Sequence, residues 1–220
     1  MELTEQDIAA YLGAHPEFFE RHAELLGNVQ LLSPHGNRAV SLQERQIELA
    51  RDKMRVLEHR LADLMRAAAE NEAISARLLD WVRMLLEQHD VAELPRTVVR
   101  EIESQFQLPH AALRLWNVDP AYAAQDYAAD VGTDVPVLAS SLAQPYCGAN
   151  AGFEAARWLA AQPASLALVA LRASDETPAF GLLVLGSPSA DRFTADMGTE
   201  FLVRIGQLAS SALLRLVRAG

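Results

Sequence analysis

The sequence predicts an α+β protein in which N-terminal helices and a long coiled-coil-type helix lead into an antiparallel sheet domain. The first observation is a 39-residue stretch, from Ile47 to Leu85, with core-type positions at alternating steps of three and four. The second is a set of short apolar runs farther along the chain, bounded by turn residues. We therefore expect short helices over residues 1–40, a long dimerisation helix over 41–87 and the sheet domain over 88–220.

Two short amphipathic helices are expected in the first part. Thr4 stands three residues before Asp7, a spacing that caps a helix ending near Ala14. Pro16 suits the first turn of a second helix that runs to Leu26. The Ser-Pro-His-Gly-Asn sequence over 33–37 then breaks the helical pattern.

The long helix begins at a capping box, in which Ser41 and Glu44 each accept from the backbone N–H group of the other. Steps that average 3.5 residues keep one seam facing a partner helix. At 1.5 Å per residue the helix would extend about 58 Å, farther than a compact domain of this size is wide. We therefore expect a homodimer. The predicted seam also contains Ala50, Ala68 and Ser75, and its predicted interface residues are Ile47, Met54, Leu57, Leu61, Leu64, Asn71, Leu78, Val82 and Leu85.

Asn71 is polar at a seam position where an apolar side chain is expected. A buried asparagine at such a position costs stability but fixes the register and the number of helices. Alternatively the two helices separate here and Asn71 faces water. The sequence leaves both interpretations open.

Beyond the long helix, Asp90 is expected to cap a helix that continues to Phe106. Strands are predicted over 111–116, 165–172 and 180–187, and the short polar loop between the last two makes them a hairpin. The segment 121–163 is poorly periodic, with short helices expected over 152–161. Thr194 is expected to cap a final amphipathic helix. The small residues Gly206, Ala209 and Ala212 in that helix would permit close approach by another helix.

Charge and composition argue against several classes of function. The net charge is −10, and the chain has one lysine, Lys53. Its arginines interleave with carboxylates, so we expect no direct nucleic-acid binding and no attraction to an anionic membrane. The acidic N-terminus is unlike a signal peptide, and no 18-residue apolar run occurs. A single cysteine, Cys147, excludes an internal disulfide. A cytoplasmic location is the expectation.

Five segments carry a resemblance to known families. The segment FGLLVLGSPSADRFTADMGTEFL resembles the closing part of a GAF domain. The segments YLGAHPEFFERHAELL, SPHGNRAVSLQERQ, PYCG and MGTEFL resemble a bacterial family, domain of unknown function family 484, whose C-terminal part is GAF-like. The resemblance implies a cytoplasmic protein with a helical N-terminal part and a six-stranded GAF-type antiparallel sheet. It brings no established activity.

GAF domains commonly bind small ligands between the sheet and its overlying loops, so the resemblance directs attention to side chains in those places. Arg114 and Trp116 share one face of the first predicted strand. An aromatic-lined cavity with one or two arginines would suit an anionic or planar ligand. The candidate ligand-binding residues are Arg114, Trp116, Tyr127, Tyr146, Cys147, Phe153 and Arg172. The alternative is that the aromatic side chains are ordinary core and that the arginines pair with carboxylates such as Glu154 or Asp175.

The sequence shows no catalytic constellation. It contains no nucleophile elbow, P-loop or G-x-G-x-x-G motif, and its histidines do not have metal-ligand spacing. Cys147 precedes a glycine and has no histidine near it in the sequence, so a structural thiol is favoured over a reactive one. We predict a non-enzymatic, dimeric regulatory or sensory module that binds a small ligand and signals through its helices to a protein partner. The alternative is a structural adaptor whose domain is empty. No cofactor or metal is indicated.

Overall fold

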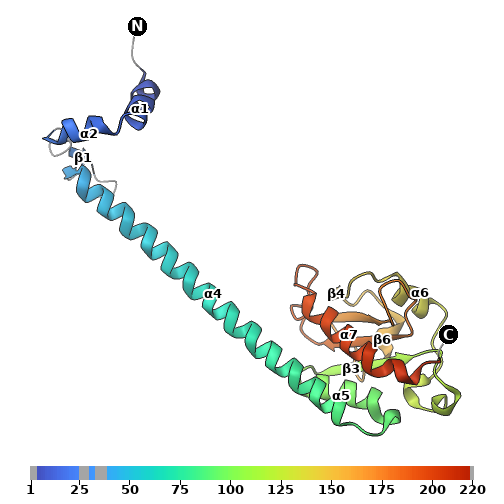
Figure 1. Ribbon diagram of the computed structural model, residues 1–220. Coiled ribbons are helices and arrows are strands. Elements are labelled where there is room, and N and C mark those ends of the chain that lie inside the picture. The colour runs from blue at the N-terminus through green and yellow to red at the C-terminus, as the bar shows by residue number, and fades with distance from the viewer. Residues whose placement is uncertain (1–3, 25–29, 33–38, 219–220) are drawn as a thin grey trace. The chain divides into compact units, whose positions relative to one another are not determined.

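The computed structural model describes residues 4–24, 30–32 and 39–218 (Figure 1). The chain divides into two compact units, Met1–Glu70 and Asn71–Gly220, which we call the N-terminal unit and the sheet domain. The division falls inside one long helix, α4 (Leu42–Glu87). The predicted long helix is therefore confirmed, and its last turns belong to the sheet domain.

In the N-terminal unit, α1 (Glu5–Ala14) and α2 (Glu17–Arg21) form where the sequence predicts helices. The predicted cap of α1 is confirmed: the Asp7 N–H group donates to Thr4 Oγ1 at 3.2 Å, and the Thr4 N–H group donates to Asp7 Oδ2 at 3.0 Å. Both bonds satisfy donors that a helix start leaves unpaired. These contacts with Thr4 lower the pKa of the Asp7 carboxyl.

Two short strands of this unit were not predicted. β1 (Gln30–Leu32) and β2 (Ala39–Ser41) pair antiparallel, with Gln30 opposite Ser41. The predicted breaker over 33–37 and the end of the second predicted helix, at residues 25–26, lie outside the described residues. The predicted capping box depends on side chains at 41–44 that are likewise not described.

The sheet domain contains four strands in an antiparallel sheet of order β3-β6-β5-β4. A 3-10 turn that Asp90 caps, accepting from the Ala92 N–H group at 2.9 Å, precedes the first helix of the domain. The elements are α5 (Leu94–Phe106), β3 (His110–Leu115), α6 (Asp134–Ser141), β4 (Tyr146–Ala149), β5 (Ser165–Leu171), β6 (Gly181–Ser187) and α7 (Glu200–Leu213). The three predicted strands are confirmed within one residue at each end.

The segment 121–163, predicted to be irregular, contains α6 and β4. The resemblance implied six strands, whereas the sheet formed by the described residues has four. β4 is only four residues long and includes a glycine, so it lacks the alternating pattern that marks a strand in a sequence. Its pairing with β5, with Cys147 opposite Ala167, is what defines it as a strand.

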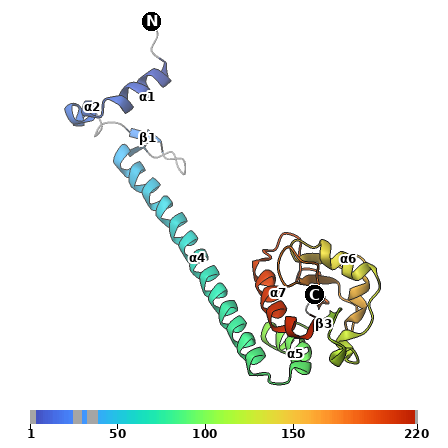
Figure 2. The same ribbon diagram turned by 45° about the vertical axis from the view of Figure 1, so that its right-hand side comes forward.

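Each face of the sheet is covered. α5, α7 and the last turns of α4 pack on one face, forming a helix-side cluster that includes Trp81, Ile102, Val169 and Ile205. α6 and the 3-10 helix η4 (Glu154–Trp158) pack on the other, forming a loop-side cluster that includes Leu168. Figure 2 shows α7 and α6 on opposite sides of the sheet. Burial on both faces explains why β5 and β6 are almost continuously apolar.

The small residues of α7 have a role different from the expected one. α7 begins at Glu200, not next to Thr194, and turns Gly206 and Ala209 toward the sheet domain's own core. A Cβ atom at Gly206 would lie 2.7 Å from Val169 Cγ1 on β5. Gly206 therefore permits α7 to pack closely against the sheet of its own domain, rather than against another helix.

Candidate functional site

A groove of about 280 Å³ runs beside the edge strand β3, and we call it the edge groove. Arg114 projects from β3 into it, and Trp158 from η4 faces Arg114. The Arg114 guanidinium carbon lies 6.0 Å from the centroid of the Trp158 ring, at the limit of a cation–π contact. Arg114 Nη1 also donates to the backbone carbonyl of Asp126. Trp158, which the sequence analysis did not select, thus contributes an aromatic ring that faces Arg114.

The wall of the edge groove opposite Trp158 comes from α5, and its charges are mostly compensated. Arg96 pairs with Glu93 and, at 2.9 Å, with Asp126. The Asp126 contact raises the pKa of the Arg96 guanidinium. Glu103 Oε1 accepts from the Ala111 N–H group at 2.6 Å, which satisfies one donor that β3 directs away from β6. The groove thus combines the Trp158 ring with two kinds of guanidinium group: Arg96, which carboxylates hold in place, and Arg114, which donates to a backbone carbonyl.

Tyr127 also lines the edge groove, and it is 3% exposed. Its hydroxyl has no hydrogen-bond partner within the described part of the chain. Burial raises the pKa of the Tyr127 phenol, so the hydroxyl stays protonated at neutral pH. A buried donor without a partner costs free energy, which makes this hydroxyl the least well satisfied polar group beside the groove.

Arg172 lies in a different groove. Its Nη2 donates to the backbone carbonyls of Ala139 and Leu142, each at 2.8 Å, and of Ser140 at 3.3 Å. These carbonyls end α6, where a helix has unpaired acceptors and a partial negative charge. Arg172 is therefore a cap of α6, and the pairing with Asp175 that the alternative interpretation suggested is absent from the ion pairs of the described residues.

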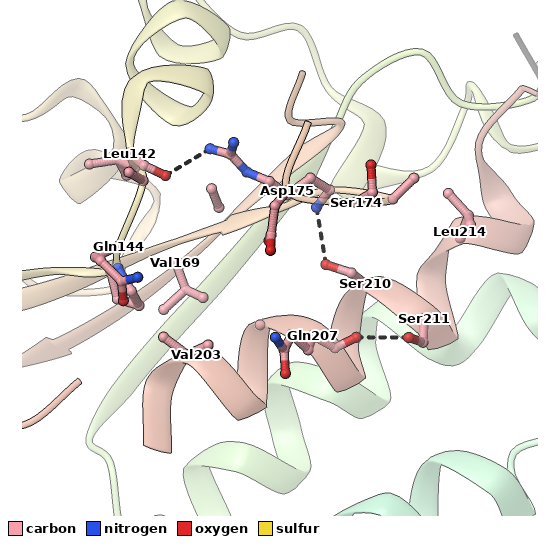
Figure 3. A pocket seen from close by; sticks show the side chains of 16 residues that line it. Leu142, Gln144, Val169, Ser174, Asp175, Val203, Gln207, Ser210, Ser211 and Leu214 are labelled. Carbon is pink, nitrogen blue, oxygen red and sulfur yellow. Dashed lines mark hydrogen bonds between the residues drawn. The ribbon is translucent and has the colours of Figure 1, made fainter. Parts of the chain in front are cut away.

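The groove beside Arg172 has a volume of about 450 Å³ and lies between α7 and the segment 142–145; we call it the α7 groove. Figure 3 shows Gln144, Val169, Asp175, Val203 and Gln207 among the side chains that line it. The Ser210 hydroxyl accepts from the Arg172 backbone N–H group at 3.1 Å. Arg114 and Arg172 thus line separate grooves.

Three other candidate ligand residues belong to the loop-side cluster. Trp116 Nε1 donates to the carbonyl of Ala179 at 2.6 Å. The Tyr146 hydroxyl donates to the carbonyl of Ala149 at 3.1 Å, and the ring meets Phe153 edge-on with centroids 5.1 Å apart. Trp116, Tyr146 and Phe153 all pack against this cluster. Their contacts favour the alternative that these aromatic side chains are core.

Cys147 points to the opposite face of β4 from Tyr146 and joins the helix-side cluster. It is 7% exposed, and burial raises the pKa of its thiol. A reactive thiolate needs a lowered pKa and access to solvent. The environment of Cys147 is that of a structural thiol.

The predicted seam has two different environments along α4. Ile47, Met54, Leu57, Leu61 and Leu64 are between 45% and 68% exposed. Asn71 and Ser75 are exposed as well.

Farther along, Leu78 and Leu85 are 9% and 6% exposed, because they pack with Trp81 inside the sheet domain's own core. Val82 is half-buried. Two residues predicted for the dimer interface are thus used within the chain itself.

Other kinds of site find no support in the described ranges. No three His, Cys, Asp or Glu side chains among the described residues gather closely enough to hold a metal ion. Of the helices searched there, none combines the length and apolar character that crossing a bilayer requires.

The fold and its grooves define an α+β protein with a long N-terminal helix and a helix-flanked antiparallel sheet. The chain belongs to the family described as "Protein of unknown function, DUF484", which matches residues 1–217. This confirms the family that the sequence resembles.

Curated relatives are "Uncharacterized protein YigA" of Salmonella typhimurium, 35% identical over 94 residues, and of Escherichia coli K12, 39% identical over 85 residues. The first alignment covers 42% of this chain and 39% of that protein, and the second covers 38% and 35%. The chain therefore matches little more than a third of the length of these relatives.

Solved structures similar to this chain include GAF domains. One comes from a protein assigned as a sensor histidine kinase of Pseudomonas syringae pv. tomato, with 18% identity, a TM-score of 0.45 and coverage of 68% of this chain and 91% of that one. Another is from the Acinetobacter phosphoenolpyruvate-protein phosphotransferase, with 12% identity, a TM-score of 0.44 and coverage of 64% and 92%. A third structure is the free methionine-R-sulfoxide reductase of Neisseria meningitidis, with 10% identity, a TM-score of 0.44 and coverage of 64% and 88%.

Proposed function

We propose that this chain is a non-enzymatic, homodimeric regulatory module of the cytoplasm that binds a small ligand and signals through its helices to a protein partner. The observation that carries the proposal is the exposed part of the predicted seam, where Ile47, Met54, Leu57, Leu61 and Leu64 are 45–68% exposed. Five large apolar side chains at heptad spacing gain free energy when a second helix covers them.

The ligand is proposed to bind in the edge groove. Arg114 and the Trp158 ring offer a cation and a flat apolar face to the same space, which suits a small planar carboxylate. The Tyr127 hydroxyl, buried beside this groove and without a partner in the described residues, gains a hydrogen bond if binding repositions it.

A physical connection joins this groove to the dimerisation helix. Val99 and Arg100 of α5 line the groove, and on the buried side of α5 the carbonyl of Val98 accepts from Trp81 Nε1 on α4 at 3.4 Å. Trp81 is fully buried, so a shift of α5 must move α4 or break this packing. We propose this contact as the route by which ligand binding alters α4.

The second candidate is a structural adaptor without a ligand. The packing of Trp116, Tyr146 and Phe153 against the loop-side cluster favours it, because that face of the sheet is filled by the protein's own side chains. In this case the dimer and the protein partner remain, and the edge groove has no occupant.

Native mass spectrometry of the gently purified full chain tests the proposal. A dimer with extra mass that is lost on denaturation supports the regulatory module, and R114M should lose the extra mass while remaining dimeric. A dimer without extra mass favours the adaptor. A monomer contradicts both, and L57R/L64R, which places like charges in the seam, supplies the reference for a monomer.

A further inference from the structure

The two most exposed large apolar side chains of the described residues are in the part of α4 that belongs to the sheet domain. Leu79 is 71% exposed and Leu86 is 75% exposed, although their neighbours Leu78 and Leu85 are buried. They are seven residues apart with half-buried Val82 between them, so the three share one face of the helix. We call Leu79, Val82 and Leu86 the exposed row.

The spacing of the exposed row relates it to the upstream seam. Leu79 follows Ala68 by eleven residues and Leu57 by twenty-two, and Leu86 stands at the same intervals from Ser75 and Leu64. At 3.6 residues per turn, eleven residues turn about 20° past three full turns, whereas seven residues fall about 20° short of two. Over the three heptads from Leu57 to Leu78 the heptad drift adds up to about 60°, while Leu79 lies about 40° from Leu57 in the opposite sense. The drift turns the strict heptad positions Leu78 and Leu85 toward the domain core. The residues that continue the exposed face of the upstream seam are therefore Leu79 and Leu86, one position after Leu78 and Leu85.

The charges beside the exposed row are compensated within the chain. Arg83, which lies next to the row, pairs with Glu87 at 2.9 Å and with Asp80 at 3.8 Å. In a parallel two-fold pair of helices, residues beside the axis lie near their own copies, so an uncompensated Arg83 would repel its counterpart. These ion pairs reduce the repulsion between the two Arg83 side chains.

We propose that a second copy of this chain packs on the exposed row, so that the dimer contact extends from the upstream seam into the sheet domain. The occupant is a second copy because the row repeats the spacing of the seam that is proposed to pair with itself. This inference rests on the homodimer of the proposed function. It adds which face of α4 contacts the second copy in the part of the helix where the heptad positions Leu78 and Leu85 are buried. Trp81, which is proposed to link the edge groove to α4, is two residues from Leu79 and therefore lies within one helical turn of this contact.

Disulfide cross-linking of the full chain tests the inference. In a C147A background, single cysteines replace Leu57, Leu79 or Leu86, and R77C provides a control on the opposite, exposed side of α4. Cysteines at the same position of a parallel two-fold helix contact come close enough to form a disulfide. We expect L57C, L79C and L86C to give covalent dimers on mild oxidation and R77C to give at least about tenfold less at equal time.

The outcomes separate the inference from the proposed function. If L57C forms dimers but L79C and L86C do not exceed R77C, the inference is wrong and the homodimer stands. If no variant forms dimers and light scattering reports a monomer, both fail.

Charge substitution gives a second readout. L79E/L86E should raise the dimer dissociation constant at least about tenfold with an unchanged circular dichroism spectrum, because both side chains are exposed in the single chain. An unchanged dissociation constant would overturn the inference.

Discussion

Arg172 Nη2 lies 2.8 Å from the carbonyl oxygen of Leu142, the residue that ends α6. The same nitrogen donates to Ala139 at 2.8 Å. Arg172 follows β5 directly, so this one side chain fastens a surface helix to the centre of the sheet. The positive charge also stands at the negative end of the α6 dipole. The arginine that the sequence suggested as a ligand contact thus caps α6 in the folded chain.

Replacing Arg172 with methionine should therefore destabilise the sheet domain. The change keeps much of the aliphatic stem and removes charged hydrogen bonds to carbonyls that are partly buried. We expect the free energy of unfolding to fall by about 2 kcal/mol in urea denaturation. R204M, at an exposed arginine of α7, is the control and should change it by less than about 0.5 kcal/mol. Equal effects of the two variants would contradict the capping role.

Replacing Gly206 with alanine should loosen α7 from the sheet. The new methyl group would lie 2.7 Å from Val169 Cγ1, so either the helix or the strand must shift. Overpacking of this kind costs about 1–3 kcal/mol, more than the gain in helix propensity of about 1 kcal/mol returns. Thermal unfolding should show a lower midpoint for G206A. G13A makes the same change in α1 with no atom within 4 Å, and it should not lower the midpoint.

Replacing Tyr127 with phenylalanine should not destabilise the protein. The variant removes a buried hydroxyl that has no partner among the described residues and keeps the ring. We expect an unchanged or higher free energy of unfolding, by up to about 1 kcal/mol. Y146F provides the comparison, since the Tyr146 hydroxyl donates to Ala149 at 3.1 Å and its loss should cost stability. A clear loss of stability in Y127F would mean that the hydroxyl has a partner in solution.

Cys147 should react slowly with thiol reagents until the protein unfolds. Burial raises the pKa of its thiol above the ordinary value of 9.0, so the folded state disfavours the thiolate. A raised pKa gives stability that is complete below the pKa of the unfolded thiol and is lost as the pH rises through the folded value. The free energy of unfolding should thus fall as the pH is raised above about 9, and C147A should show a smaller fall. Fast labelling of the native protein at pH 8 would contradict the burial.

Local signals in the sequence were sufficient for much of the fold. The Thr4 cap, the long helix and three strands depend on the periodicity of apolar positions and on capping residues, which are properties of neighbouring residues. β4 and α6 were missed because their pattern is weak, and pairing with β5 or packing on the sheet stabilises them. We expected the final helix to begin beside Thr194, because threonine is a common helix cap. The helix begins six residues later, at Glu200.

The surroundings of the candidate site residues could not be predicted from the sequence, for a physical reason. Period-two alternation identified the face on which Arg114 and Trp116 lie, but alternation does not reveal what covers that face. Trp158 meets Arg114 only because η4 folds over the sheet, and Arg172 meets α6 carbonyls more than 30 positions away in the chain. Contacts at such separations leave no local mark in one sequence.

By itself, the sequence determined which residues of α4 are apolar and that they recur at steps of three and four, about one helical turn, along one long helix. Only the tertiary structure decided which of them remain available to a partner. Leu78 and Leu79 are chemically identical neighbours, yet Leu78 packs in the core with Trp81 and Leu79 is 71% exposed. Adjacent residues of a helix point in directions about 100° apart. The rest of the sheet domain packs against the side of α4 that carries Leu78, and so it leaves Leu79 exposed.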